Sequence, residues 1–254
     1  EDVKVGPYSS GLVAYLPMDN KGNIAPEVIN QNNGFVTGTV TGSGRFGNAR
    51  YFKNAKDSIN FDQLLIKGNK TLSFWIKSDR PLSTKDGWEI GFLNDNYSTG
   101  TMFGMMYGVG NSQDLGFWGY GSEYDYSIEK YNNKWSSDGI WHNVVLTQNN
   151  GKVSIFVDGV KKSLFSHSSG ISNQSITIKE TVNNYFKIHT RTSDFGGSYK
   201  AVDEVAIWNK VLTDSEIDKI YTTKKPIINL IGENDKIFNP TTCLDILKAN
   251  NAVK

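Results

Sequence analysis

The chain has 254 residues, 38% of them hydrophobic, and a formal net charge of +1 at pH 7. This apolar content is enough for the core of one sandwich-sized domain with short additions. The near-zero net charge argues against a nucleic-acid-binding protein, and no apolar stretch approaches the ~20 residues that span a bilayer. We therefore expect no nucleic-acid partner and no membrane insertion in this segment.

The first half of the chain carries the alternating pattern of short, half-buried β-strands. The predicted strands span residues 11–20, 34–54, 56–61, 70–79, 88–95, 101–110 and 114–122. The pattern is clearest in residues 70–79, where Leu72, Phe74 and Ile76 share one face and Trp75 lies on the other. We expect Trp75 to be a core ring.

The stretch GIWHNVVLTQNNGKVSIFVDGV, residues 139–160, predicts two consecutive tight turns. An Asn-Asn-Gly run at 149–151 separates two alternating runs, and an Asp-Gly pair at 158–159 follows the second. These residue types tolerate the positive φ that tight hairpins require. We expect a three-stranded meander, with Trp141 in the core and His142 as a packed or solvent-facing strand residue rather than a catalytic base.

The C-terminal part is predicted to contain further strands at 184–192 and 201–213 and a helix at 213–221. Thr213 followed three residues later by Glu216 is a capping-box pattern, which marks the start of a helix.

The composition changes after this helix, which sets the expected domain limits. We expect a lead-in over residues 1–10, one domain over 11–222, and a linker or the start of a second domain over 223–254. Cys243, the single cysteine, excludes an internal disulfide and a multi-cysteine metal site. It is either a structural thiol or a partner for a cysteine outside this chain.

Several segments in order resemble the laminin-G-like, concanavalin A-like jelly roll over about residues 11–222. They are GLVAYLPMDN, GRFGNARYF, TLSFWIKS, GIWHNVVLT with GKVSIFVDGV, and VDEVAIWNKVLTDSEI. The resemblance implies an all-β fold of two curved antiparallel sheets packed face to face, with one short C-terminal helix. The tail TTCLDILKANNAVK faintly resembles the start of fibrinogen C-terminal-like domains.

The resemblance also implies a place and a partner. Such modules are extracellular and belong to larger surface proteins, often bacterial adhesins, some of the pilin type. Their ligands are glycans or host glycoproteins, so we expect this chain to be a secreted or surface-displayed adhesin module.

Aromatic and polar residues gather in three stretches that we expect to form the glycan site. Rings stack on sugars, and planar polar groups hydrogen-bond to them. The candidates are Trp88, Trp118, Tyr120, Tyr124, Tyr126, Arg191 and Asp194. The alternative is that these rings belong to the core and to solvated loops.

The resemblance further implies a calcium ion where the loop after the first strand meets the last strand. The matching residues are Asp19, Asn20, Asn33 and Asp203, which offer the oxygen ligands that calcium prefers. However, Pro26 and Glu27 stand where the family loop often carries a denser polar run. The alternative is that Asp203 hydrogen-bonds to loop backbone without an ion.

Concanavalin-like jelly rolls also include family-16 glycoside hydrolases, which resemble one another in a Glu-x-Asp-x-Glu strand motif. The nearest pattern here, Glu123, Asp125 and Glu129, is longer. On an extended strand its outer carboxyl groups would lie about 20 Å apart, whereas glycosidases need ~5–9.5 Å. We therefore expect no enzyme. We favour the adhesin module over a carbohydrate-binding accessory module of a hydrolase, and both over a catalytic glycosidase.

Overall fold

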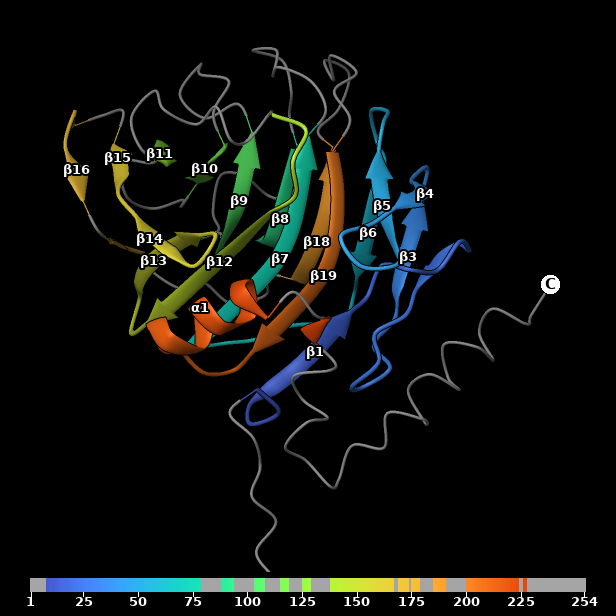
Figure 1. Cartoon of the computed structure of the whole chain (residues 1–254), viewed down its shortest axis with the longest axis horizontal. Coiled ribbons are helices and arrows are strands. Elements are labelled where there is room, and N and C mark those ends of the chain that lie inside the picture. The colour runs from blue at the N-terminus through green and yellow to red at the C-terminus, as the bar shows by residue number, and fades with distance from the viewer. Residues whose placement is uncertain are drawn as a thin grey trace, which may run out of the picture.

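The computed structural model describes residues 8–78, 88–93, 103–107, 115–118, 125–128, 138–166, 169–173, 175–178, 185–190, 200–223 and 226–227. This part of the chain forms two β-sheets that face each other, with one helix packed on the outside of the first sheet (Figure 1).

Sheet A has the strand order β14-β13-β12-β7-β19-β5-β4 in the described residues, with β1 paired to β19 and β17 to β13. The strand bounds are β1 (Leu12–Leu16), β4 (Val40–Ser43), β5 (Asn48–Phe52), β7 (Lys70–Ser78), β12 (His142–Asn149), β13 (Lys152–Val157), β14 (Val160–Lys162), β17 (Ile176–Thr177) and β19 (Lys200–Trp208). The long strands β7 and β19 lie side by side near the middle of this sheet.

Sheet B has the order β16-β15-β11-β10-β9-β8-β18-β6-β3-β2. Its bounds are β2 (Ile24–Ala25), β3 (Gly34–Thr37), β6 (Ser58–Phe61), β8 (Trp88–Leu93), β9 (Phe103–Tyr107), β10 (Leu115–Trp118), β11 (Asp125–Ile128), β15 (Leu164–Ser166), β16 (Ser172–Asn173) and β18 (Tyr185–Thr190). The strand pairs of both sheets are antiparallel. The expected all-β jelly-roll sandwich is confirmed.

The main core fills the space between the two sheets. Leu72, Phe74 and Ile76 of β7 face it, as their alternation predicted, and each is at most 2% exposed. A second cluster lies on the opposite side of sheet A, where Trp208 and Phe156 meet the helix residues Ile217 and Ile220. Sheet A is therefore buried on both faces over part of its area.

Trp75 belongs to the outer side of sheet A and is 2% exposed. Its ring stacks on Tyr221 with centroids 6.1 Å apart, and the edge-on ring of Phe46 lies 6.2 Å away. The guanidinium of Arg45 lies 4.6 Å from the ring centroid, a cation–π contact. The ring thus joins the helix and the loop before β5 to the sheet.

Helix α1 (Asp214–Thr222) begins where the capping-box pattern predicted. The Thr213 hydroxyl accepts the Glu216 N–H, and the Glu216 carboxylate accepts the Thr213 N–H at 2.6 Å. Both bonds satisfy amide groups that the first helical turn leaves without intrahelical partners. Among the described residues no helix is both long and apolar enough to cross a membrane.

The three-stranded meander β12–β13–β14 is confirmed, with both of its turns. Asn150 and Gly151 have φ values of 48° and 80°, and Asp158 and Gly159 have values of 52° and 76°. Two central residues with positive φ match the tight turns that follow the right-handed twist of paired strands. The register then pairs Thr147 with Ser154 across the first hairpin.

His142 begins β12 and lies between two aspartates. Its Nδ1 is 2.7 Å from Asp158 Oδ2, and its Nε2 is 3.3 Å from both carboxylate oxygens of Asp138. Burial alone would lower the pKa of His142, but the hydrogen bonds and charges of these aspartates outweigh burial and raise it. The histidine therefore links the start of β12 to the turn before β14, while neighbouring Trp141 is half-buried.

Both ends of the described chain pack on sheet A. The Trp208 indole N–H donates to the Tyr8 carbonyl at 2.7 Å, and the Tyr8 hydroxyl donates to the Glu216 carbonyl. Ile227 is 1% exposed and belongs to the second cluster. The folded unit thus includes residues on both sides of the 11–222 span expected from the sequence.

Replacing Trp75 with Ala should lower the free energy of unfolding by roughly 3–5 kcal/mol, because it leaves a large cavity between the sheet and the helix. Chemical denaturation followed by circular dichroism measures this change. Trp141→Ala is the control: its ring is only half-buried, so we expect a smaller loss. Equal losses in the two variants would contradict the assigned packing of Trp75.

Candidate functional site

Trp88, which was expected to stack on a ligand, is buried in the core instead. It is the first residue of β8, it is 0% exposed, and its ring packs edge-on against Phe52 in the main core. The residues of β8 alternate inward and outward, and Trp88 shares the inward side with Ile90 and Phe92. The predicted strand at 88–95 is present, and its pairing with β18, Trp88 opposite Thr190, sets which side faces the core.

The other candidates are only partly described. Tyr126 lies in β11, where it is partly buried and packs against the main core. Trp118 ends β10, with its backbone opposite Asp125, and its side chain lies outside the described part. The remaining candidates also lie outside the described residues: Tyr120, Tyr124, Arg191, Asp194 and the two acids Glu123 and Glu129.

The strand register separates the points where two of the expected loops attach. Thr190, the last residue of β18, pairs with Trp88 at one end of sheet B. The turn from β10 to β11 starts at Trp118 and returns at Asp125. Phe117 of β10 lies opposite Met105 of β9, so the next residue, Trp118, lies toward the Phe103 end of β9. Phe103 pairs with Phe92, at the end of β8 far from Trp88. The β10–β11 turn therefore leaves the other end of sheet B. Because the two loops attach at opposite ends of sheet B, the strand register does not support one ligand-binding edge formed by both of them.

The outer face of sheet B offers a different arrangement in its described strands. A row of paired residues runs across it from Gly104 in β9 through Gly91, Lys187 and Asn60 to Phe35 in β3. Strands lie about 4.8 Å apart, so Lys187 and Phe35 are separated by about 10 Å. Tyr185, two residues from Lys187, lies on the same face. We call these six residues the sheet B strip.

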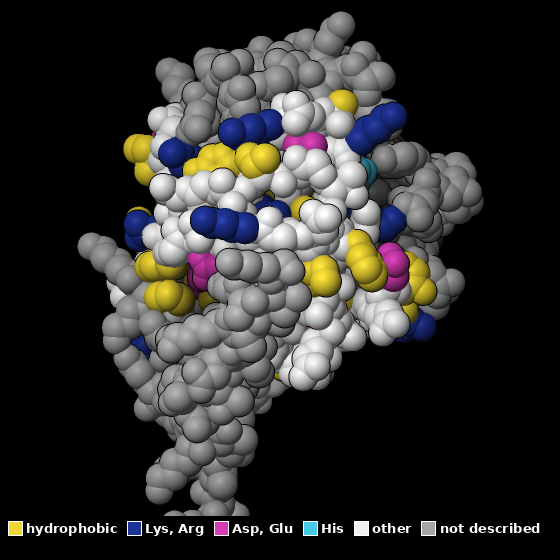
Figure 2. Space-filling model, turned by 90° about the vertical axis from the view of Figure 1, so that its right-hand side faces the viewer, with side chains coloured by type: hydrophobic (Ala, Val, Ile, Leu, Met, Phe, Trp, Pro, Cys, Tyr) yellow, Lys and Arg dark blue, Asp and Glu magenta, His cyan; other side chains and the backbone are white. Residues whose placement is uncertain are grey.

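The two rings of the strip are accessible. Phe35 is 63% exposed and Tyr185 is 38% exposed, and Ile24, the partner of Phe35 in β2, is also exposed. Figure 2 shows the side of the molecule that carries β3, β4 and β5, where hydrophobic side chains form small groups between polar atoms and basic side chains. Exposed rings beside an amide and an amine are the groups that commonly contact sugars.

The two glycines of the strip are buried where β8 and β9 meet. A Cβ added to Gly104 would lie 2.4 Å from the Ile90 carbonyl oxygen, and one added to Gly91 would lie 2.4 Å from the Gly104 Cα. Side chains are therefore excluded there, and the accessible part of the strip consists of Phe35, Asn60, Lys187 and Tyr185.

Next to the strip, His189 of β18 lies opposite Glu89 of β8. Their Nε2 and Oε2 atoms are 2.9 Å apart, and the Glu89 side chain is only 1% exposed. The pair links β18 to β8 through their side chains.

The acids expected to bind calcium lie on the other sheet, at a β-bulge in β19. The register of β19 against β7 shifts between Asp203 and Ala206, and Glu204 adopts a φ of 51°. Val202 and Val205 both face the main core, so the two acids between them both point to the outer side of sheet A.

These two acids hold separate parts of the chain in place. Asp203 Oδ2 accepts the Phe46 N–H at 3.0 Å, and its Oδ1 accepts the Glu204 N–H at 2.9 Å. Glu204 Oε2 accepts both the Tyr15 hydroxyl at 2.7 Å and the Ile227 N–H at 3.0 Å. The contacts of Asp203 match the alternative given above, in which it hydrogen-bonds to loop backbone.

The other expected calcium ligands also bond to backbone N–H groups. Asp19 Oδ1 accepts from Asn48, Asn20 Oδ1 from Gly22, and Asn33 Oδ1 from Glu27. Among the described residues no group of three or more His, Cys, Asp or Glu side chains could hold a metal ion. In this structure backbone N–H groups occupy an oxygen of each of these four side chains, and calcium binding here stays a prediction.

Glu27, which interrupts the polar run expected in this loop, organises the loop instead. Its carboxylate is 2% exposed and accepts backbone N–H groups of Tyr15, Ile29, Asn30 and Asn32. A carboxylate that collects several amide donors shapes a loop without any metal.

Burial strongly shifts the titration of the bulge acids. It raises the pKa of Asp203 to about 8, with the charge of Glu204 adding to the shift. It also raises the pKa of Glu204 to about 7, although the hydrogen bonds from Tyr15 and Ile227 act to lower it. The unfolded chain would titrate both groups near pH 4, so folding favours their protonated forms.

These raised pKa values predict how stability depends on pH. The stabilisation is fully present below pH ~4 and is lost as the pH rises through 7 to 8. Glu204→Gln keeps an oxygen acceptor for Tyr15 and Ile227 but carries no charge. Its loss of unfolding free energy between pH 5 and 9 should be smaller than the wild-type loss, by on the order of 1–3 kcal/mol.

Denaturant titrations at several pH values measure this difference. Asp62→Asn removes an exposed carboxylate and should reproduce the wild-type profile. Parallel profiles for Glu204→Gln and the wild type would mean that the bulge does not carry the pH dependence.

A second test concerns calcium, because the oxygens of the four expected calcium ligands already accept hydrogen bonds. Thermal melts with calcium and with a chelator should have the same midpoint, because an ion that binds the folded chain would raise it. A calcium-dependent rise that disappears in Asp19→Asn would overturn this expectation and restore the metal site.

Comparison with known proteins places the chain in a family. The family model of the concanavalin A-like lectin/glucanases superfamily, Laminin_G_3, matches residues 46–218, more than half of the chain. A search of curated proteins gave no match.

Solved structures agree on the fold. The binding domain of Paraclostridial Mosquitocidal Protein 1 is 19% identical with a TM-score of 0.57, and the match covers 84% of this chain and 52% of that domain. Trypanosoma rangeli sialidase is 16% identical with a TM-score of 0.60, covering 85% of this chain and 33% of the sialidase. The binding domain of botulinum neurotoxin DC in complex with SialylT is 15% identical with a TM-score of 0.55, covering 85% and 51%.

The chain spans about half the length of these toxin binding domains and a third of the sialidase. At these identities the likeness concerns the fold alone. The family match, the two antiparallel sheets and the capped helix α1 agree: the chain belongs to the concanavalin A-like lectin/glucanase superfamily and has the jelly roll of its laminin-G-like members.

Proposed function

We propose that this chain is a glycan-binding module that holds its ligand on the outer face of sheet B. The observation that carries the proposal is the sheet B strip, in which two exposed rings, Phe35 and Tyr185, lie on the same face as Lys187 and Asn60. The rings would contact the apolar faces of sugars, while the amine and the amide would hydrogen-bond to hydroxyl groups.

The similar structures support a binding role. Two are binding domains of toxins, one of them in complex with SialylT, and a third is a sialidase. The family name likewise combines lectins and glucanases. Sialylated and neutral glycans are both reasonable ligands on this basis.

We further propose that the module binds without hydrolysis. The described acids nearest to the strip and in the bulge are occupied: Glu89 pairs with His189, and Asp203 and Glu204 bond to backbone and to Tyr15. A glycosidase needs two carboxyl groups presented on either side of the scissile bond. Purified protein should therefore not release sugars from sialosides, galactans or β-glucans.

The wider setting is part of the same proposal. By its resemblance to surface modules, the chain would act outside the cell as part of a larger adhesin that recognises a host glycoprotein. The competing setting is an accessory module of a glycoside hydrolase. Both require glycan binding, so the binding site is the first thing to test.

Glycan-array screening of the purified chain, followed by titration calorimetry with the best ligand, tests the site. Phe35→Ala should reduce affinity by about tenfold, the loss expected from ~1.4 kcal/mol of ring contact, with little change in melting temperature. Ile140→Ala is the matched control, since Ile140 is 60% exposed, close to the 63% of Phe35, and lies outside the strip. A glycan bound equally well by both variants would exclude the strip as its site.

A further inference from the structure

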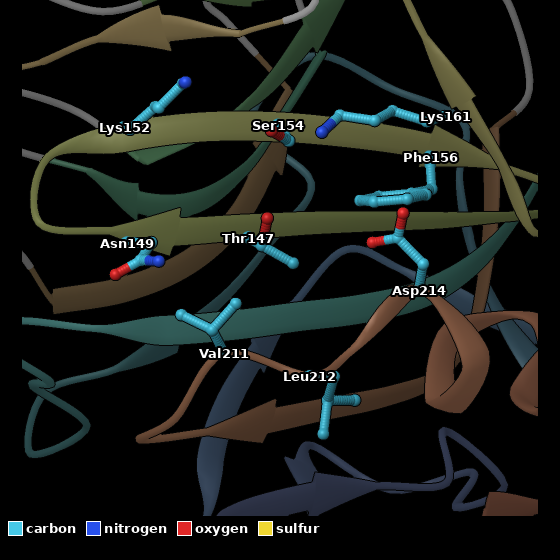
Figure 3. A pocket seen from close by; sticks show the side chains of 9 residues that line it. All are labelled: Thr147, Asn149, Lys152, Ser154, Phe156, Lys161, Val211, Leu212 and Asp214. Atoms are coloured by element: carbon cyan, nitrogen blue, oxygen red, sulfur yellow. The ribbon is translucent and has the colours of Figure 1, made fainter.

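The opposite face of the sandwich carries a pocket of its own. It lies on the outer side of sheet A, beside the start of α1, and has a volume of about 200 Å³. Its lining residues are Thr147, Asn149, Lys152, Ser154, Phe156, Lys161, Val211, Leu212 and Asp214 (Figure 3). We call it the hairpin pocket, because strands β12, β13 and β14 supply six of these residues.

The strand register explains why these residues meet. Thr147 pairs with Ser154, Asn149 with Lys152, and Phe156 with Lys161. The residues between them, such as Leu146 and Ile155, face the main core, so the paired residues share the outer side. Val211 and Leu212, before α1, and Asp214, its first residue, close the pocket.

The floor of the pocket has unused hydrogen-bonding capacity. Thr147 and Ser154 are 6% and 9% exposed. Within the described part of the chain, neither hydroxyl makes a hydrogen bond to another residue. Neither oxygen is among the buried polar atoms without a partner in the described residues, so both are open to the pocket, where water or a ligand can bond to them.

The rim carries charges of both signs. Lys161 reaches over the pocket from β14 and Asp214 approaches from the opposite side, while Lys152 lies at the start of β13 with its amine turned outward in this view (Figure 3). The amine of Lys161 points toward Ser154 and lies 5.7 Å from the centroid of the Phe156 ring, a cation–π contact that holds it over the pocket. In the described residues neither Lys152 nor Asp214 forms an ion pair.

This combination selects a ligand by its chemistry. Two amines attract an anionic group, whereas the Asp214 carboxylate repels a second anion and accepts hydrogen bonds from hydroxyl groups. The two floor hydroxyls can both donate and accept. A molecule with one carboxylate and several hydroxyls on a single ring matches all of these groups and the small volume.

We propose that the hairpin pocket binds an acidic monosaccharide unit, such as a uronic acid. Its carboxylate lies between Lys152 and Lys161, and its hydroxyls bond to Asp214, Thr147 and Ser154. The pocket is on the other side of the sandwich from the sheet B strip, so it goes beyond the proposed function and does not depend on it.

The test is an NMR titration of the whole chain with methyl β-glucuronide, monitored by backbone amide shifts. Amides of residues 147–156 and 211–214 should shift, and methyl β-glucoside, the neutral analogue, should bind more weakly by about tenfold, the effect of losing charge-assisted hydrogen bonds. Lys161→Met should weaken glucuronide binding by a similar factor, because Met keeps a chain over Phe156 without the charge. Lys67→Met, at an exposed lysine away from the pocket, should have no effect.

Four outcomes would overturn the proposal. Equal affinities for glucuronide and glucoside would exclude recognition of the carboxylate. Equal shifts with sodium acetate would reduce the pocket to an unspecific anion site. Shifts confined to the sheet B strip would place the acidic sugar there, which rejects the hairpin pocket while supporting the proposed function. The absence of any shift up to the solubility limit of the glucuronide would reject the pocket as a sugar site.

Discussion

The β-bulge at Asp203 and Glu204 is the constraint on which much of this structure depends. In a regular strand one of these acids would face the main core, where an unpaired charge is very costly. The bulge turns both outward, where Asp203 bonds to the loop before β5 and Glu204 bonds to Tyr15 and to the chain after the helix. The first strand, the loop at Gly44–Gly47 and the chain after α1 are thus fastened to one point in the middle of sheet A.

The same fastening makes the two faces of the sandwich unequal. The outer side of sheet A is covered by α1, Tyr8 and Ile227, which form a second hydrophobic cluster. The end of the β12–β13 hairpin, next to the start of α1, forms a pocket on this side. The outer side of sheet B has no such helix in the described residues, and its strands present Phe35, Asn60, Lys187 and Tyr185 on one face. A face with exposed rings suits an extended glycan, and a small charged pocket suits one sugar unit.

This division bears on how the module would work. Single sugar contacts are weak, and two binding faces on one module would allow a branched or repeated glycan to engage both. The acids of the fold contribute by shaping loops. Glu27 collects backbone amides where the family resemblance had implied a cation site, and Asp203 does the same for the loop at Phe46. Their roles explain how a loop without the expected polar run can still hold its shape.

The sequence by itself determined the strands, the two tight turns and the capped helix, because alternation, Asn-Gly and Asp-Gly pairs and the Thr-x-x-Glu box act over a few residues. It also determined the family, since the order of the segments carried the resemblance.

The sequence could not determine which aromatic rings are accessible. Trp88 is the first residue of β8 and Phe35 the second residue of β3, and each follows a glycine. Trp88 is nevertheless buried, whereas Phe35 is exposed. That difference depends on which side of each strand faces the second sheet, and on whether another element covers the side that remains. Only the tertiary structure decides this, because it is set by pairing between strands far apart in the chain, such as β8 with β18 and β3 with β6. The same long-range pairing brings Lys161 and Asp214 to one pocket, and it places the attachment points of two of the expected loops at opposite ends of sheet B.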